Sequence, residues 1–307
     1  MKKKNFILAV LLSLGLSTVW AEDNSSNSNV RYVKTPRFAR PLVEKWISEY
    51  AKVEPGIQFE IAKGGVKDVN LSVTFEQRDD AANASQSTIY FGEFAVLPIT
   101  ARNSEAEKIL AGKRLNAKKL KQLYFLDDEF EEDVKKNKQF EQLTIYSGSN
   151  ATSVAGSFAH SLGQENENFR GKRISGDDQF LNTAIQKDPL GVTFNALSNI
   201  FDLQSRQLKS DVSIIGIDVK KNLEQAFSNE ASIDDLINIL ENDKVQGVAV
   251  EKVGLNYNGL DDEVARFLQW VLENGTQYNH QFGILNLDRK LAETERHKLE
   301  TALTAQK

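Results

Sequence analysis

The sequence predicts an α/β fold in which mostly parallel sheets are flanked by helices. Apolar residues recur with a period of two in some segments and with helical spacing in others, and the two kinds of segment alternate along the chain. Such alternation is typical of parallel sheets, because each helix carries the chain back to the start of the next strand. The 307 residues are enough for two domains. In such folds, ligands bind where strand ends meet helix starts, often between domains.

The first 21 residues are expected to be a cleavable signal peptide. Three lysines precede an apolar run from Phe6 to Val19, and Ala21 is the small residue that cleavage requires. Residues 22–31 are polar and are expected to form a flexible N-terminal spacer. The chain has no cysteine, which excludes disulfides and a lipid anchor on cysteine. We therefore expect a periplasmic protein.

The charge of the chain limits its partners. The formal net charge is −5, and the expected signal peptide contributes three lysines and no acid, so the mature chain is more acidic still. This balance argues against nucleic acid or an anionic membrane as a partner. The acidic net charge does not exclude a small anion as a ligand, because local dipoles rather than the net charge bind such a ligand.

The N-terminal part predicts one helix and three strands. Leu42, Trp46 and Tyr50 recur with helical spacing, and Pro41 suits a first helical turn, where its missing N–H group is not needed. The alternation of apolar residues predicts strands at 57–61, 69–75 and 87–100.

The rest of the chain continues the alternation. A helix at 115–126 is expected to be capped by Asn116, and the highly charged residues 127–142 are expected to be solvated. A helix and a strand are expected within 175–194, separated at Pro189. The remaining expected helices are 232–242 and 260–282, and the remaining expected strands are 143–146, 213–219 and 245–255.

The segment SGSNATS, residues 147–153, leads into apolar residues at helical spacing. A helix start presents unpaired N–H groups and a partial positive charge, so a loop of small residues there can enclose an oxyanion. Gly148 would let the backbone approach the anion, and Ser149, Asn150, Thr152 and Ser153 would add hydrogen-bond donors. Alternatively, one of these residues caps the helix and the others fill a turn. Asp177 and Asp178 also lie at an expected helix start, where capping is the favoured role and ligand binding is the alternative.

Five stretches resemble the PstS-like phosphate-binding proteins of bacterial ABC importers. They are TPRFARPLVEKWISEYAKVEPGIQFEI, LNAKKLKQLYF, SGSNATS, GDDQFLNTAIQKDPLGVTFNAL and FLQWVLENGTQYNHQFGILNLD, and the match covers most of residues 33–290. The resemblance implies the two-lobed periplasmic-binding-protein fold, with the ligand in a cleft between the lobes. Lobe 1 would hold residues 32–100 and 213–307, and lobe 2 would hold residues 101–212. It further implies a monomer that captures phosphate or a similar oxyanion for an inner-membrane ABC permease or an envelope transport complex.

The resemblance also assigns a binding loop to the first lobe. Thr35 and Phe38 occupy the matching loop there, and Arg37 is expected to supply a cation for the ligand. In the alternative interpretation, Arg37 and Arg40 are exposed residues of an amphipathic helix.

Two departures from the family open a second interpretation. The helix that normally follows the second strand is missing after Gly65. Phe75 or Glu76 stands where the family has an aspartate, and Ile145 or Tyr146 stands where it has an arginine. The alternative is an envelope accessory or interaction protein of the same fold that has lost small-anion binding.

No pattern in the sequence indicates an enzyme, a cofactor or a metal site. His160, His280 and His297 lack the spacing of zinc ligands, and SGSNA is not the GxSxG motif of serine hydrolases. No glycine-rich dinucleotide motif or P-loop is present. We therefore expect a binding protein without catalytic residues.

Overall fold

The computed structural model describes residues 30–76, 87–126, 138–150 and 153–305. The expected signal peptide and most of the spacer lie outside the described residues, as do residues 127–137 of the charged segment. The strands are β1 (Val30–Lys34), β2 (Gln58–Ile61), β3 (Leu71–Phe75), β4 (Thr88–Ala101), β5 (Thr144–Gly148), β6 (Lys172–Ile174), β7 (Gly191–Ala196), β8 (Val212–Ile214) and β9 (Ala249–Tyr257). The α-helices are α1 (Arg40–Val53), α2 (Glu105–Leu110), α3 (Ala117–Tyr124), α4 (Lys138–Glu141), α5 (Ala155–Ser161), α6 (Gln179–Lys187), α7 (Leu197–Ile200), α8 (Ile233–Asn242), α9 (Asp262–Glu273) and α10 (Arg289–Thr304).

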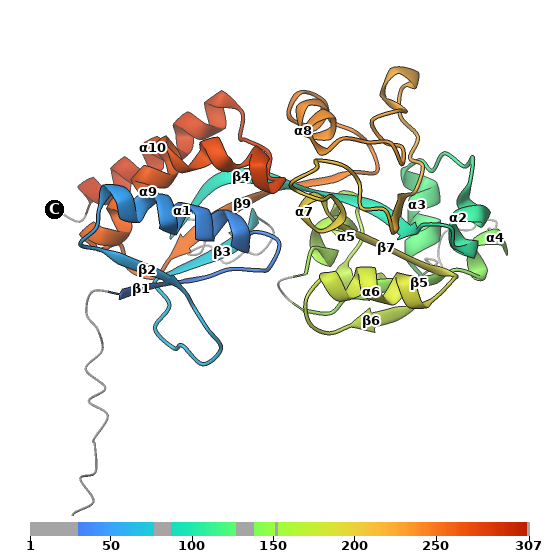
Figure 1. The fold of residues 1–307 in the computed structure, drawn as a ribbon, viewed down its shortest axis with the longest axis horizontal. Helices are drawn as coiled ribbons and strands as arrows, with labels where there is room; N and C mark the ends of the chain where they lie inside the picture. The colour runs from blue at the N-terminus through green and yellow to red at the C-terminus, as the bar shows by residue number, and fades with distance from the viewer. Residues whose placement is uncertain (1–29, 77–86, 127–137, 151–152, 306–307) are drawn as a thin grey trace, which may run out of the picture.

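The described strands pair in the order β2-β1-β3-β9-β4-β7-β5-β6, and β8 also pairs with β4. β1 is parallel to β2 and β3 in one lobe, and β5 is parallel to β6 and β7 in the other. The long strands β4 and β9 are antiparallel to their neighbours and run between the two lobes (Figure 1). The predicted two-lobed α/β fold is confirmed, with antiparallel pairing added by the strands that cross between the lobes.

The first lobe is held together by apolar residues of α1. Its buried face carries Leu42, Trp46 and Tyr50, as the helical spacing predicted. The Trp46 ring meets the Phe91 ring edge to face at 4.6 Å, and its Nε1 donates a hydrogen bond of 2.8 Å to the carbonyl of Gly275. α1, α9 and α10 cover the same side of the strands of this lobe (Figure 1).

The second lobe is built on stacked aromatic rings. Phe158 of α5 and Phe194 of β7 stack at 4.3 Å, and Phe169 stacks on Phe194 at 5.1 Å. Tyr124 at the end of α3 meets Phe158 edge to face and donates a hydrogen bond of 2.8 Å to the carbonyl of Thr193. These contacts fix the positions of α5 and β7 within the second lobe.

Three local features follow the sequence closely. The Asn116 side chain accepts a hydrogen bond of 3.0 Å from the N–H of Lys119, which confirms it as the cap of α3. Pro41 lies in the first turn of α1. Residues 62–70 form a turn in which Gly65 has φ 97°, so no helix separates β2 from β3.

The expected continuous helix at 260–282 is wrong. α9 ends at Glu273, and two short 3-10 turns follow from Gly275 to Phe282. A Cβ atom at Gly275 would lie 2.9 Å from Nε1 of Trp46, so this close packing favours glycine where the regular helix stops.

The chain after residue 212 continues to pair with the second lobe. β8 pairs with Ile99–Ala101 at the end of β4, and the N–H of Leu115 donates to the carbonyl of Gly216 at 2.9 Å. β9 then carries the chain back beside β3. The lobe boundary expected at residue 213 stays a prediction.

Candidate functional site

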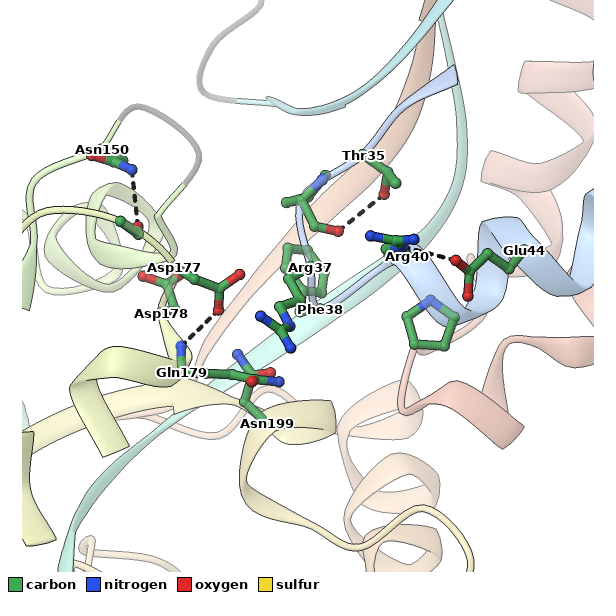
Figure 2. A pocket seen from close by; sticks show the side chains of 13 residues that line it. Thr35, Arg37, Phe38, Arg40, Glu44, Asn150, Asp177, Asp178, Gln179 and Asn199 are labelled. Atoms are coloured by element: carbon green, nitrogen blue, oxygen red, sulfur yellow. Dashed lines mark hydrogen bonds and ion pairs between the residues drawn. The ribbon is translucent and has the colours of Figure 1, made fainter. Parts of the chain in front are cut away.

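A cavity of about 750 Å³ opens between the two lobes. Its first wall is the loop from β1 to α1 with the first turn of α1, and its second wall is the segment around the start of α6 (Figure 2). The lining residues are Thr35, Pro36, Arg37, Phe38, Arg40, Pro41 and Glu44 on the first wall, and Asn150, Gly176, Asp177, Asp178, Gln179 and Asn199 on the second. The cavity brings together four of the predicted site residues, namely Thr35, Arg37, Phe38 and Asn150.

The first wall is anchored by Phe38. This side chain is 4 % exposed, and its ring lies 5.7 Å from that of Phe75 and 5.1 Å from that of Phe94. The Thr35 hydroxyl donates to the carbonyl of Pro36 at 3.0 Å, and the N–H of Arg40 donates to the same carbonyl at 3.1 Å. Burial of one aromatic ring thus holds a tight polar turn at the edge of the cavity.

Two arginines on this wall differ in their surroundings. Arg40 pairs with Glu44 one helical turn later, with Nε at 2.7 Å from the carboxylate. Arg37 is exposed, and no hydrogen bond or ion pair engages its guanidinium group within the described parts of the chain. Figure 2 shows the Arg37 side chain extending from the first wall into the gap. Arg37 therefore has its charge available to a ligand.

The second wall holds the loop after β5 against β6. The N–H of Ser149 donates to the carbonyl of Ile174 at 2.9 Å, and the Ser149 hydroxyl donates to the same carbonyl at 3.2 Å. Nδ2 of Asn150 donates to the carbonyl of Gly176 at 2.9 Å. The Ser149 hydroxyl and Nδ2 of Asn150 therefore donate hydrogen bonds within the protein. Asn150 lines the cavity, whereas Ser149 does not. Thr152 lies outside the described residues.

The start of α5 is occupied by a carboxylate of the protein itself. Oδ1 of Asp178 accepts a hydrogen bond of 2.5 Å from the Ser153 hydroxyl, and Oδ2 accepts one of 3.0 Å from the N–H of Val154. Ser153 is 3 % exposed and Asp178 is 8 % exposed. The negative charge that the structure places at this helix start is that of Asp178, and binding of a free oxyanion by residues 147–153 stays a prediction.

Gly148 has a packing role at the same place. A Cβ atom at this position would overlap with Oγ of Ser153 and would lie 2.9 Å from Oδ1 of Asp178. The residue is absent from the cavity lining, as are Ser149 and Ser153. The glycine thus makes room for the hydrogen bond between Ser153 and Asp178.

The cavity also includes residues outside the two expected binding loops, among them Asp177 and Asn199. Oδ1 of Asp177 accepts a hydrogen bond of 2.8 Å from the N–H of Gln179, so Asp177 does satisfy a donor at the start of α6. The Asn199 carbonyl accepts from Nζ of Lys209 at 2.7 Å and from Nδ2 of Asn182 at 3.0 Å. Burial lowers the pKa of Lys209. The acidic segment GDDQ before the expected helix was a local indication of this wall. Asn199 comes from α7, and no local sequence pattern indicated it.

The charges in the cavity nearly balance. Two cations, Arg37 and Arg40, face three carboxylates, Glu44, Asp177 and Asp178. Glu44 is paired with Arg40, and Asp178 is held by the start of α5. The charges that remain for a ligand are those of Arg37 on the first wall and Asp177 on the second.

Within the described part of the chain, no group of three or more His, Cys, Asp or Glu side chains is arranged to hold a metal ion. Nor does any helix there have both the length and the apolar character needed to cross a membrane.

Two solved structures with a similar fold carry phosphate transport in their descriptions. One is a phosphate-bound structure from Clostridium perfringens of a candidate phosphate ABC transporter substrate-binding protein, with 13% identity and a TM-score of 0.53 over 85% of this chain and 100% of that one. Another is an ABC-type phosphate transport receptor from Vibrio cholerae, with 10% identity and a TM-score of 0.54 over 84% of this chain and 99% of that one. No family model and no curated protein matches the chain in sequence. The chain therefore shares the two-lobed fold of periplasmic substrate-binding proteins.

Proposed function

We propose that this protein is a periplasmic solute-binding protein. It captures a small solute that carries an oxyanion group, phosphate or a similar group, and delivers it as a monomer to an inner-membrane ABC permease or an envelope transport complex. The observation that carries the proposal is the cavity of about 750 Å³ lined from both lobes, with the available cation Arg37 at its mouth. The volume is typical of a site for a small molecule. The proposed activity is binding without chemistry.

The residues of the first wall have distinct proposed roles. Arg37 binds the oxyanion group, because its planar guanidinium group can donate two parallel hydrogen bonds to one anion. Thr35 contributes its hydroxyl group by exchanging its hydrogen bond to the Pro36 carbonyl for one to the ligand, and Phe38 fixes the loop through its buried ring. On the second wall, Asn150 lines the cavity and is the proposed amide contact. Gly148 and Ser153 support the site indirectly by positioning Asp178.

Closure of the two lobes completes the proposed site. The strands β4 and β9 connect the lobes, so bending within them moves the two walls toward each other (Figure 1). Water then leaves the cavity and the hydrogen bonds of Arg37 to the ligand strengthen, because charges interact more strongly in a less polar medium. Capture in this scheme depends on donors from both lobes meeting one ligand.

A specific observation favours the second candidate function, an accessory or interaction protein of the envelope. The N–H group at the start of α5, which was expected to bind a free anion, is taken by Asp178. The loss of those donors weakens any site for a bare inorganic anion.

Titration calorimetry of the mature protein separates the two candidates. The ligands are phosphate, sulfate, molybdate, tungstate and ethyl phosphate. Capture predicts saturable binding of at least one of them, weakened roughly tenfold in Arg37→Gln, because a hydrogen bond to a charged group is lost. Arg289→Gln is the matched control, since Arg289 is exposed on α10 and pairs locally with Glu293. The absence of binding across the series would favour the accessory role.

A further inference from the structure

The charges that face each other across the cavity have opposite signs. Arg37 extends from the first wall, and the Asp177 carboxylate lies on the second (Figure 2). One oxygen of Asp177 accepts from the N–H of Gln179 at 2.8 Å, and the other oxygen points into the gap in Figure 2. A solute between the walls therefore meets a cation on one side and a carboxylate on the other.

A bare oxyanion fits this arrangement poorly. Its negative charge is attracted by Arg37 and repelled by Asp177. The other two carboxylates of the cavity are already compensated within the protein. The Glu44 carboxylate is matched by Arg40 at 2.7 Å, and the Asp178 carboxylate by the Ser153 hydroxyl and the N–H of Val154. No second unpaired cation lines the cavity, whose lining residues all belong to the described part of the chain.

We propose that the solute is a small zwitterion, with an anionic group bound by Arg37 and an ammonium group bound by Asp177. This inference rests on the proposed function and specifies its ligand class. An ammonium group donates three hydrogen bonds and matches the acceptor oxygen of Asp177. The Gln179 amide lines the cavity and is suited to polar groups between the two ends, whereas Nδ2 of Asn150 and Nδ2 of Asn199 donate hydrogen bonds within the protein. The volume of about 750 Å³ leaves room for a solute larger than a tetrahedral anion.

The test compares two phosphate monoesters of similar size. Phosphoethanolamine and ethyl phosphate share the phosphate group, and only the first carries an ammonium group. Calorimetry on the mature protein is expected to show phosphoethanolamine binding at least roughly tenfold more tightly, as expected for one hydrogen-bonded charge pair. Arg37→Gln should weaken both ligands by similar factors.

Asp177→Asn is the decisive variant. It should abolish most of the preference for phosphoethanolamine while ethyl phosphate binds as well as before or better, because the repelling charge is gone. Asp235→Asn is the matched control, since it makes the same change at an exposed carboxylate of α8 outside the cavity lining and should leave the ratio of the two affinities unchanged. An unfolding curve for each variant shows that it is folded. Asp177 accepts a single N–H bond at the surface of α6, and Asp177→Ser is the replacement if Asp177→Asn does not fold.

The outcomes separate this inference from the proposed function. Equal affinity for the two monoesters, or a ratio that Asp177→Asn leaves unchanged, overturns the zwitterion while capture stands. If Asp177→Asn strengthens both ligands equally, Asp177 competes for Arg37 and does not bind an ammonium group, which also overturns it. If neither monoester nor any inorganic oxyanion binds, the proposed function fails and this inference fails with it.

Discussion

Replacing Asp178 tests whether the anion at the start of α5 is part of the protein. Asp178→Ala removes the acceptor of the Ser153 hydroxyl at 2.5 Å and of the N–H of Val154 at 3.0 Å. Hydrogen bonds to a charged group contribute about 1.5–3 kcal/mol each, so we expect a loss of roughly 3–6 kcal/mol in the free energy of unfolding. With an unfolding entropy of about 2.1 cal/mol/K per residue, the melting temperature of the mature chain should fall by roughly 5–10 °C.

The matched control is the neighbouring residue. Asp177→Ala removes the same side chain one position earlier, where it accepts one hydrogen bond from the N–H of Gln179. Its expected cost is about 0.5–2 kcal/mol, the usual effect of losing a helix cap. Urea and thermal unfolding of the mature wild type and both variants measure the difference.

A free anion should partly restore the altered protein. The space left by the Asp178 side chain still faces the N–H of Val154, so acetate or phosphate can bind there in Asp178→Ala. At a concentration ten times its dissociation constant, such an anion stabilises the folded state by about 1.4 kcal/mol. The same addition should stabilise Asp178→Ala by more than it stabilises the wild type. If Asp178→Ala proves as stable as Asp177→Ala, the carboxylate does not satisfy the start of α5 and the reasoning is refuted.

Two further predictions concern packing and pH. Gly148→Ala should lose roughly 1–3 kcal/mol of stability in urea unfolding, because its Cβ would overlap with Ser153. The control is Gly56→Ala. No atom lies within 4 Å of a Cβ at Gly56, so this variant should change stability by less than about 0.5 kcal/mol. Burial raises the pKa of Glu295 above its usual 4.5, although a hydrogen bond from the N–H of Tyr90 acts in the opposite direction. The folded state therefore loses stability as the pH rises through the folded-state pKa of Glu295 and the carboxyl group ionises. Glu295→Gln should therefore gain stability relative to the wild type between pH 4 and pH 8, and a difference in unfolding free energy that is independent of pH would contradict this.

Local sequence patterns predicted the elements well where one element carries its own signal. The apolar face of α1, the cap Asn116 and the strands β3 and β4 each follow from residues within a few positions of one another. Spacing of this kind reflects which side of an element is buried, and that is a local property of the chain.

The candidate site was predicted in part for the same reason. The turn before α1, with Arg37 and Phe38, and the loop after β5 both carry short polar signals next to a helix start. Asn199 could not be found in this way, because only the packing of α7 brings it to the cavity. The end of α9 at Glu273 was missed because the next turn packs Gly275 against Trp46, more than 200 positions earlier in the chain.

The amino-acid sequence by itself determined the alternation of strands and helices, and it marked the start of α5 as a place for negative charge. Only the tertiary structure decided which charge stands there, since Asp178 reaches Ser153 and Val154 from 25 and 24 positions away in the chain. Helix dipoles and capping act within one turn, so the residues near a helix start can indicate that a negative charge is stabilising there. The packing of β5, β6 and α6 brings the Asp178 carboxylate to the start of α5. Of the other charged side chains that line the cavity, Arg37 and Asp177 are not paired with another charge among the described residues.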